Sequence, residues 1–187
     1  MKYAPVKWRR HYNLHAPSLT LMLSTLQDLY LDELRGLYDA EQQLLKALPI
    51  FEKIAHEDPL KTIFSDHLRQ TQIHVQRLDS IVGSFDQEPS GRICKAMRSL
   101  IAEGKQHARD EADPMVKDAA LIAAAQRIEH FEIACYGTAR TFAELLGFPR
   151  AAEILQRTLS EEAGADERLT EIARTINVEA LAGDRSY

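Results

Sequence analysis

One stretch of the chain, residues 118–137, constrains the fold more than any other. It is too apolar and too rich in alanine to be a surface helix. Six residues recur at helical spacing and define a face that we expect to be buried: Leu121, Ala125, Ile128, Cys135, Tyr136 and Ala139. Glu129 and Glu132 lie on or beside that face, and their spacing of three makes them neighbours. Because burying an unpaired carboxylate is costly, we expect positive charge to meet both.

The rest of the chain also has helical periodicity, and no segment has the alternating pattern of a strand. Thr25 and Asp28 resemble a capping box and predict the start of the first helix. Pro49 should bend this helix rather than end it, because the apolar period continues beyond it. Gly147 is a signal for the end of a helix. The predicted helices cover about residues 25–56, 59–83, 92–107, 113–146 and 149–176.

The lengths of the connections predict the fold. Tight hairpins near residues 57–59 and 147–149 join the first long helix to the second and the third to the fourth. The short helix, about 16 residues and ~24 Å long, suits a crossover that returns the chain along the bundle. We therefore predict an all-α fold, a ferritin-like four-helix bundle with a short extra helix in the crossover between helices two and three. The bundle should span 25–177, between an N-terminal extension, 1–24, and a C-terminal tail, 178–187.

Composition limits the kinds of partner and the compartment. The 187 residues suffice for one domain, and the net charge of −5 argues against nucleic acid as a partner. No apolar run reaches the ~20 residues of a membrane span, and the extension lacks a signal-peptide cleavage site. Cys94 and Cys135 lie in separate apolar patterns and are interpreted as core thiols, which fits a reducing compartment. These features predict a cytoplasmic protein that binds no membrane.

Polar side chains from all four long helices fall at similar distances from the hairpins, about 16–27 Å at 1.5 Å per residue. We expect them to meet in one layer across the bundle. The predicted metal ligands are Glu41, Gln70, His74, Glu129, Glu132, Glu162 and Asp166. Five carboxylates cannot stay ionised in a dry core without cations, and two divalent ions nearly balance their charge. Carboxylate together with imidazole suits iron or manganese.

Each of these residues also has a purely structural interpretation. Single carboxylates could pair with arginines across helix seams, and the candidates are Arg35, Arg127 and Arg140. His67 and His130 are interpreted as core or rim residues. Tyr38 and Tyr136 lie near the layer, where they either pack in the core or direct a hydroxyl at a metal ligand.

At these residues the chain resembles the YciE/YciF-type bacterial stress proteins, a ferritin-like family related in fold to rubrerythrins. The resemblance covers about residues 25–177 and rests on residues 37–45, 118–137, 138–147 and 158–169. It implies a two-metal centre, with iron as the metal, and a homodimer. Glu129 and Glu132 are similar to the third-helix pair of rubrerythrins, in which the second Glu is an additional ligand. The chain departs from the family at Gln70, where the family has Glu, and His74 could offset that change as a direct ligand.

Three hypotheses for function follow. The first is a metal-dependent oxidoreductase or peroxidase that reduces peroxide or dioxygen. The second is oxidation and sequestration of ferrous iron without turnover. The third is a stress-induced binding or structural protein that kept the bundle and weakened the site, and Gln70 motivates it. The chain has no Cys-x-x-Cys pair, so it carries no rubredoxin-type electron-transfer module.

Overall fold

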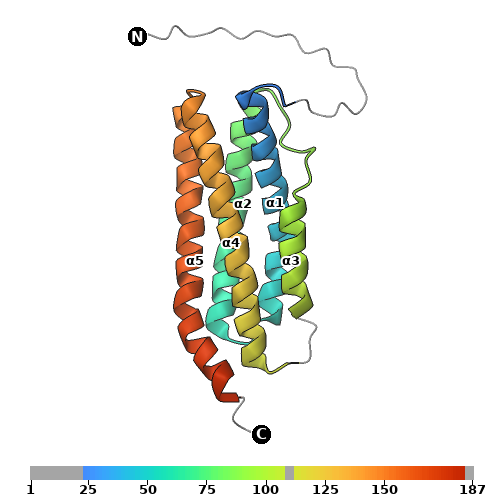
Figure 1. Ribbon diagram of the computed structural model, residues 1–187, viewed down its shortest axis with the longest axis vertical. Coiled ribbons are helices and arrows are strands. Elements are labelled where there is room, and N and C mark those ends of the chain that lie inside the picture. Colours follow the sequence, from blue (N-terminus) through green and yellow to red (C-terminus); the bar gives the residue numbers. More distant parts are fainter. Residues whose placement is uncertain (1–22, 108–111, 184–187) are drawn as a thin grey trace.

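A computed structural model describes residues 23–107 and 112–183, and in these ranges the chain consists of α-helices and short connections without a strand (Figure 1). The helices are α1 Leu26–Ile54, α2 Asp58–Gly83, α3 Lys95–His107, α4 Pro114–Leu145 and α5 Pro149–Gly183. The predicted all-α class is confirmed. Most of the predicted N-terminal extension lies outside the described residues.

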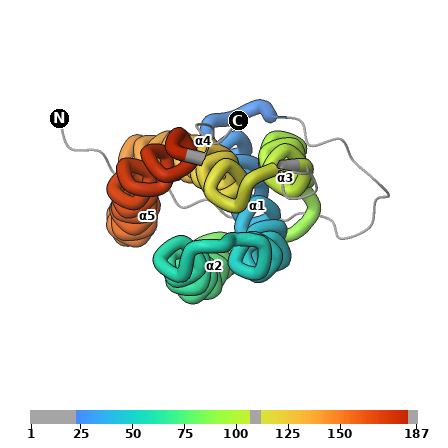
Figure 2. Tube along the Cα trace, turned by 90° about the horizontal axis from the view of Figure 1, so that it is seen from below, coloured from blue at the N-terminus to red at the C-terminus, as the bar shows by residue number. Residues whose placement is uncertain are grey.

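The helices are arranged as two antiparallel hairpins, α1 with α2 and α4 with α5 (Figure 1). The two hairpin turns lie at opposite ends of the molecule, so α2 and α4 run in the same direction. The segment between them must therefore return the chain along the bundle, and α3 lies in that segment. Figure 2 shows α1, α2, α4 and α5 around a common centre, with α3 outside them against α1 and α4. This is the predicted bundle with a short helix in the crossover.

Two helix bounds differ from the prediction by more than two residues. We expected the crossover helix to begin near residue 92, but α3 begins at Lys95 because the residues before it bind α1 instead. Arg92 donates to the Asp32 carbonyl oxygen at 2.7 Å, and the Cys94 amide donates to Asp39 Oδ2 at 2.7 Å.

The last helix is longer than the sequence pattern indicated. We expected it to end near residue 176, where the apolar face ends, but α5 continues to Gly183. The added residues include Glu179, Ala180 and Leu181, which have high helix propensity, and no proline interrupts them. Propensity therefore extends this helix beyond the last residues that pack in the core.

The predicted helix ends at residues 25 and 147 are both present. Thr25 Oγ1 accepts from the Asp28 amide at 3.0 Å, and Asp28 Oδ2 accepts from the Thr25 amide at 3.0 Å, which completes the capping box. α1 continues through Pro49, as predicted. After α4, Gly147 adopts a φ of +79°, a backbone conformation that residues with a Cβ avoid.

The core is divided into two hydrophobic clusters, and a layer of buried polar residues lies between them. On α1, Leu37 belongs to one cluster and Leu44 to the other. On α4, Ile128 and Tyr136 are separated in the same way. The polar layer thus falls at corresponding heights on the helices, as the distances from the hairpins predicted. Among the described residues, no helix is long and apolar enough to cross a membrane.

Asp118 connects the first hairpin to the start of α4. It is fully buried, and its two carboxylate oxygens accept from the backbone amides of His56 and Glu57, both at 2.8 Å. These amides lie in the turn between α1 and α2, where no helical partner is available to them. Asp118 therefore fixes the position of this turn against α4.

We predict that Asp118→Ala destabilises the protein by about 2–4 kcal/mol, because two backbone amides of the turn lose a buried, charged acceptor. Urea unfolding followed by circular dichroism measures the change. Asp79→Ala, at an exposed position of α2, is the control and should change the free energy of unfolding by less than about 0.5 kcal/mol. A loss at Asp118 no larger than that at Asp79 would contradict the assigned role.

Candidate metal centre

The polar layer receives side chains from every helix of the bundle. α1 provides Glu41, α2 provides His67 and His74, α4 provides Glu129 and Glu132, and α5 provides Glu162. All six are buried, and none is more than 3% exposed. Helical spacing explains the pairs: His67 and His74 are two turns apart, and Glu129 and Glu132 are three residues apart, so each pair lies on one face.

These residues form two groups that share one carboxylate. The first group is His67, Glu129, Glu132 and Glu162, and the second is Glu41, His74 and Glu162. Within each group, one potential ligand atom from every residue lies within 4.8 Å of all the others. Because Glu162 belongs to both, the arrangement suits two adjacent cations with a carboxylate between them.

Each of the two histidines faces carboxylates of its own group. His67 Nε2 lies 3.4 Å from Glu129 Oε1 and 3.8 Å from Glu162 Oε2. His74 Nδ1 lies 3.0 Å from Glu162 Oε1 and 3.3 Å from Glu41 Oε1. The distances permit ion pairs, but neither Nδ1 of His74 nor the nitrogens of His67 meet hydrogen-bond geometry with a partner in the described chain.

Most ligand atoms of the layer lack a hydrogen-bond partner among the described residues. They are Glu41 Oε2, His67 Nδ1 and Nε2, His74 Nδ1, Glu129 Oε2, Glu132 Oε1 and Oε2, and Glu162 Oε1 and Oε2. Buried polar atoms without partners are rare because each one carries a desolvation cost of about 1–3 kcal/mol. Metal ions would supply partners for eight of these nine atoms, because each imidazole binds a metal through one nitrogen and the other nitrogen of His67 remains.

Burial and mutual repulsion shift the acidities of the carboxylates. Burial, followed by the nearby charge of Glu162, raises the pKa of Glu129 well above its ordinary value. Burial, followed by the charge of Glu41, does the same to the pKa of Glu132. Burial also raises the pKa of Glu41, although His74 partly opposes this. The carboxylates therefore favour a proton, or a cation in its place.

The two histidines shift in opposite directions. Burial lowers the pKa of His67, and the neighbouring Glu162 offsets only part of that effect. Burial also disfavours the charged form of His74, but the carboxylates of Glu162 and Glu41 outweigh it and raise the pKa of His74 to about 11. In the metal-free protein, His74 is thus a cation within the layer, and His67 is neutral.

Two divalent ions would balance the charge of the layer. Its four glutamates carry four negative charges when ionised, and two divalent cations carry four positive charges. The two histidines would ligate as neutral imidazoles through one nitrogen each. The residues present therefore fit a two-metal centre in the number, charge and chemistry of their ligands.

Tyr136 extends the layer on the side of α4. The sequence left open whether it packs in the core or directs its hydroxyl at a ligand. Its hydroxyl donates to Glu41 Oε1 at 2.5 Å, and the ring is buried. Tyr136 thus orients a carboxylate of the layer, whereas Tyr38 packs at the edge of a hydrophobic cluster.

Two of the seven predicted ligands lie at the margin of the layer. Gln70 Oε1 accepts from Arg168 at 3.3 Å. Asp166 Oδ1 lies 3.3 Å from Gln126 Nε2 and 3.4 Å from His130 Nδ1, on the outer side of α4 and α5. Neither residue belongs to the two groups. Their role as ligands stays a prediction.

His67 is a residue whose place in the layer sequence reasoning missed. It was interpreted as a core histidine, and it is buried, but it lies in the first group beside Glu129 and Glu162. Its spacing of seven from His74 was the available signal, since residues two turns apart lie on one helix face.

The arginines proposed as alternative partners of the carboxylates bind elsewhere. Arg35 donates to Glu88 and Gln87 in the connection after α2. Arg127 pairs with Glu103 at 2.8 Å, and Arg140 donates to Gln156. His74, and none of these three arginines, is therefore the cationic partner found in the described part of the layer.

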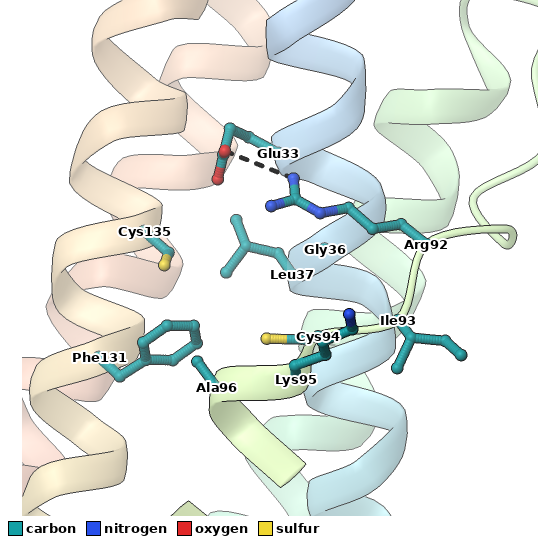
Figure 3. A pocket seen from close by; sticks show the side chains of 10 residues that line it. All are labelled: Glu33, Gly36, Leu37, Arg92, Ile93, Cys94, Lys95, Ala96, Phe131 and Cys135. Carbon is teal, nitrogen blue, oxygen red and sulfur yellow. Dashed lines mark hydrogen bonds and ion pairs between the residues drawn. The ribbon is translucent and has the colours of Figure 1, made fainter. Parts of the chain in front are cut away.

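A separate cavity of about 330 Å³ lies where α1, the start of α3 and α4 meet (Figure 3). Cys94 and Cys135 both line it, and both thiols are free. We expected core thiols, but each is half-buried at the edge of the core. Burial raises the pKa of Cys94, and it raises the pKa of Cys135 to about 11, so both stay protonated at neutral pH.

Comparison with known proteins connects this bundle to a family. A sequence model of the family described as "Domain of unknown function (DUF892)" matches residues 25–182. Protein YciF of Escherichia coli (strain K12) is 40% identical over 152 residues, which cover 81% of this chain and 92% of YciF.

Solved structures resemble the chain over most of its length. The crystal structure of the E. coli stress protein YciF aligns with a TM-score of 0.79 and 38% identity, covering 82% of this chain and 97% of YciF. YcfI of Rhodopseudomonas palustris, described as a candidate structural protein, aligns with a TM-score of 0.78 and 40% identity over 82% of this chain and 98% of its own. A Xanthomonas campestris protein, 18% identical with a TM-score of 0.67 over 86% of this chain and 98% of its own, shares the fold.

We predict that the metal-free protein loses stability as pH rises above about 6.5. The pKa values of Glu129, Glu132 and His74 are raised in the folded state, so the folded protein holds protons that unfolding releases. Stability from such groups is complete below the pKa of the unfolded state and is lost as pH rises through the folded pKa. Each group costs up to about 1.4 kcal/mol per pH unit within its window. His67, whose pKa is lowered, acts in the opposite direction but at lower pH. Urea unfolding in chelator at pH values from about 6.5 to 8.5 measures this slope.

Glu132→Gln tests the cost of the buried charge at a single residue, because both carboxylate oxygens of Glu132 lack partners in the described chain. In chelator at pH about 8.5, it should be more stable than the wild type by roughly 1–2 kcal/mol, because the buried charge is gone. With manganese or iron added, the order should reverse. A variant less stable than the wild type in chelator would contradict the assigned electrostatics.

Proposed function

The chain belongs to the family described as Domain of unknown function (DUF892), and from that premise we propose that it is a stress-response protein that binds two divalent metal ions inside its bundle. Iron is the metal we propose, with manganese as the alternative, because carboxylate and imidazole ligands suit both. The proposed activity is metal-dependent reduction of peroxide or dioxygen.

One observation carries the proposal: nine buried ligand atoms without hydrogen-bond partners in the described chain converge on two groups that share Glu162. Hydrogen bonding in the described chain does not account for them, and the arginines near the helix seams bind elsewhere. Two adjacent cations would satisfy all of these atoms except one nitrogen of His67, and they would neutralise the layer.

The ligands fall into two sets. His67, Glu129 and Glu132 would hold one ion, Glu41 and His74 would hold the other, and Glu162 would contact both. When bound, a pair of redox-active ions supplies the two electrons that reduction of a peroxide requires, and an external donor must restore them.

The protein's own part in such chemistry is positioning and exclusion of water. Tyr136 donates to Glu41 and fixes that carboxylate. The hydrophobic clusters above and below the layer keep water from the buried carboxylates, which strengthens their attraction for cations. The raised pKa values of Glu129 and Glu132 mean that binding must displace protons, so affinity should rise with pH.

A second function is favoured by Gln70. The resemblance to the YciE/YciF-type proteins implies a Glu at position 70, but this chain has a neutral amide that binds Arg168. A relative is described as a candidate structural protein. On this alternative the bundle binds metal, or none, without turnover. Metal content and peroxide consumption distinguish the two.

We predict that protein loaded with iron binds close to two ions per chain and that Glu162→Ala loses most of this metal, because Glu162 belongs to both groups. Elemental analysis after desalting measures the ratio. Glu167→Ala, on the exposed face of the same helix, is the matched control and should retain wild-type metal content. An unchanged ratio in Glu162→Ala would contradict the assignment of the ligands.

The same proteins test turnover. Iron-loaded wild type and Glu167→Ala should consume peroxide when a reductant is supplied, and Glu162→Ala should not. Loaded wild type that consumes neither peroxide nor dioxygen would remove the proposed activity and favour the structural alternative.

We propose further that the chain acts in the cytoplasm as a homodimer, and the free thiols support a reducing compartment. Sizing chromatography with light scattering should give about 42 kDa, twice the 21.2 kDa of one chain. A dimer cannot enclose a mineral core, so this result would also argue against iron storage. A large closed assembly would contradict the prediction and favour sequestration.

A further inference from the structure

We propose that Glu161, held by Arg77, is a positioning residue that orients His74 toward the metal centre. This inference rests on the metal-binding function proposed above and concerns how one of its ligands is held. Glu161 directly precedes Glu162 on α5. Consecutive residues of a helix point about 100° apart, so these two can contact one ring from different sides.

The ring of His74 is held between them. Nδ1 faces inward, 3.0 Å from Glu162 Oε1, and Nε2 faces outward, 2.9 Å from Glu161 Oε2. His74 is fully buried, whereas the Glu161 side chain is 28% exposed, so the contact runs from the centre to the rim of the bundle. With Nε2–H donating to Glu161, the nitrogen that remains for a metal is Nδ1, the one that faces Glu41 and Glu162.

Glu161 is itself fixed on its outer side. Arg77 Nη1 and Nη2 donate to its two oxygens at 2.5 and 3.0 Å, a bidentate pair. Arg77 Nη1 also donates to the buried Thr158 Oγ1 at 3.0 Å. Arg77 lies three residues after His74 on α2, so α2 and α5 hold the ring through the same carboxylate. The carboxylate cannot turn away from His74 without breaking the bidentate pair.

The alternative is that Arg77 and Glu161 form a surface salt bridge with no role at the centre, and this alternative predicts different effects on stability and metal binding. Loss of such a salt bridge would lower stability slightly and would change both metal positions equally or not at all. An orienting role predicts a selective effect. The position that uses His74 should weaken, and the position that uses His67 should not.

The experiment is a titration of metal-free protein with Mn²⁺ alone, followed by calorimetry and by electron paramagnetic resonance. Glu161→Ala should weaken one of the two positions by about 10–100-fold and leave the other within about threefold. Glu161→Gln should lose less, because its amide oxygen can still accept from Nε2–H. Glu167→Ala is the control and should match the wild type. Equal weakening of both positions, or none, would overturn the inference.

A second readout does not depend on metal. In crystal structures of the metal-free proteins, His74 Nδ1 should stay beside Glu162 in the wild type, and the ring should turn in Glu161→Ala. An unchanged ring in that variant overturns the inference. If the wild type binds neither Mn²⁺ nor Fe²⁺, the proposed function fails, and the orientation of the ring still decides whether Glu161 positions it.

Discussion

The structure depends on one electrostatic constraint, the burial of four glutamates at one height of a helical bundle. In an apolar interior these carboxylates repel one another, and burial alone makes their ionised forms costly. His74 offsets part of the charge in the metal-free protein, and His67, held neutral by burial, does not. The layer therefore favours cations, and the helices hold its carboxylates and imidazoles close together.

Much of the fold followed from the sequence because the signals were local and strong. The capping box at Thr25, the glycine at residue 147 and the prolines at helix starts placed most helix ends within a few residues. The bounds that differed depend on other forces. α3 begins late because Arg92 and Cys94 bind α1, a tertiary contact that periodicity cannot show. α5 continues past the core because helix propensity acts without packing.

The site was less predictable than the fold, and the reason is the direction in which side chains point. Counting residues from the hairpins gives the height of a side chain along the bundle but only roughly its angle around the helix. Gln70 and Asp166 have suitable heights, yet each binds a partner at the margin of the layer. His67 has the right angle because it lies two turns from His74, but a lone histidine is more often structural. Glu161 is adjacent to a predicted ligand and gave no periodic signal, since its role depends on a contact with another helix.

The two hydrophobic clusters stabilise the fold, and the polar layer between them forms the candidate site. Each cluster packs residues from both hairpins, so the bundle gains hydrophobic stabilisation on either side of the layer. This stabilisation offsets the desolvation cost of the polar atoms in the layer that lack hydrogen-bond partners in the described chain. Two contacts orient residues of the layer. Tyr136, which belongs to one of the clusters, donates to Glu41. Glu161, held by Arg77 at the rim, contacts His74. Changes at the rim would therefore alter how the proposed cations are held without removing apolar contacts from the clusters, so a bundle of this kind could vary its chemistry while keeping its fold.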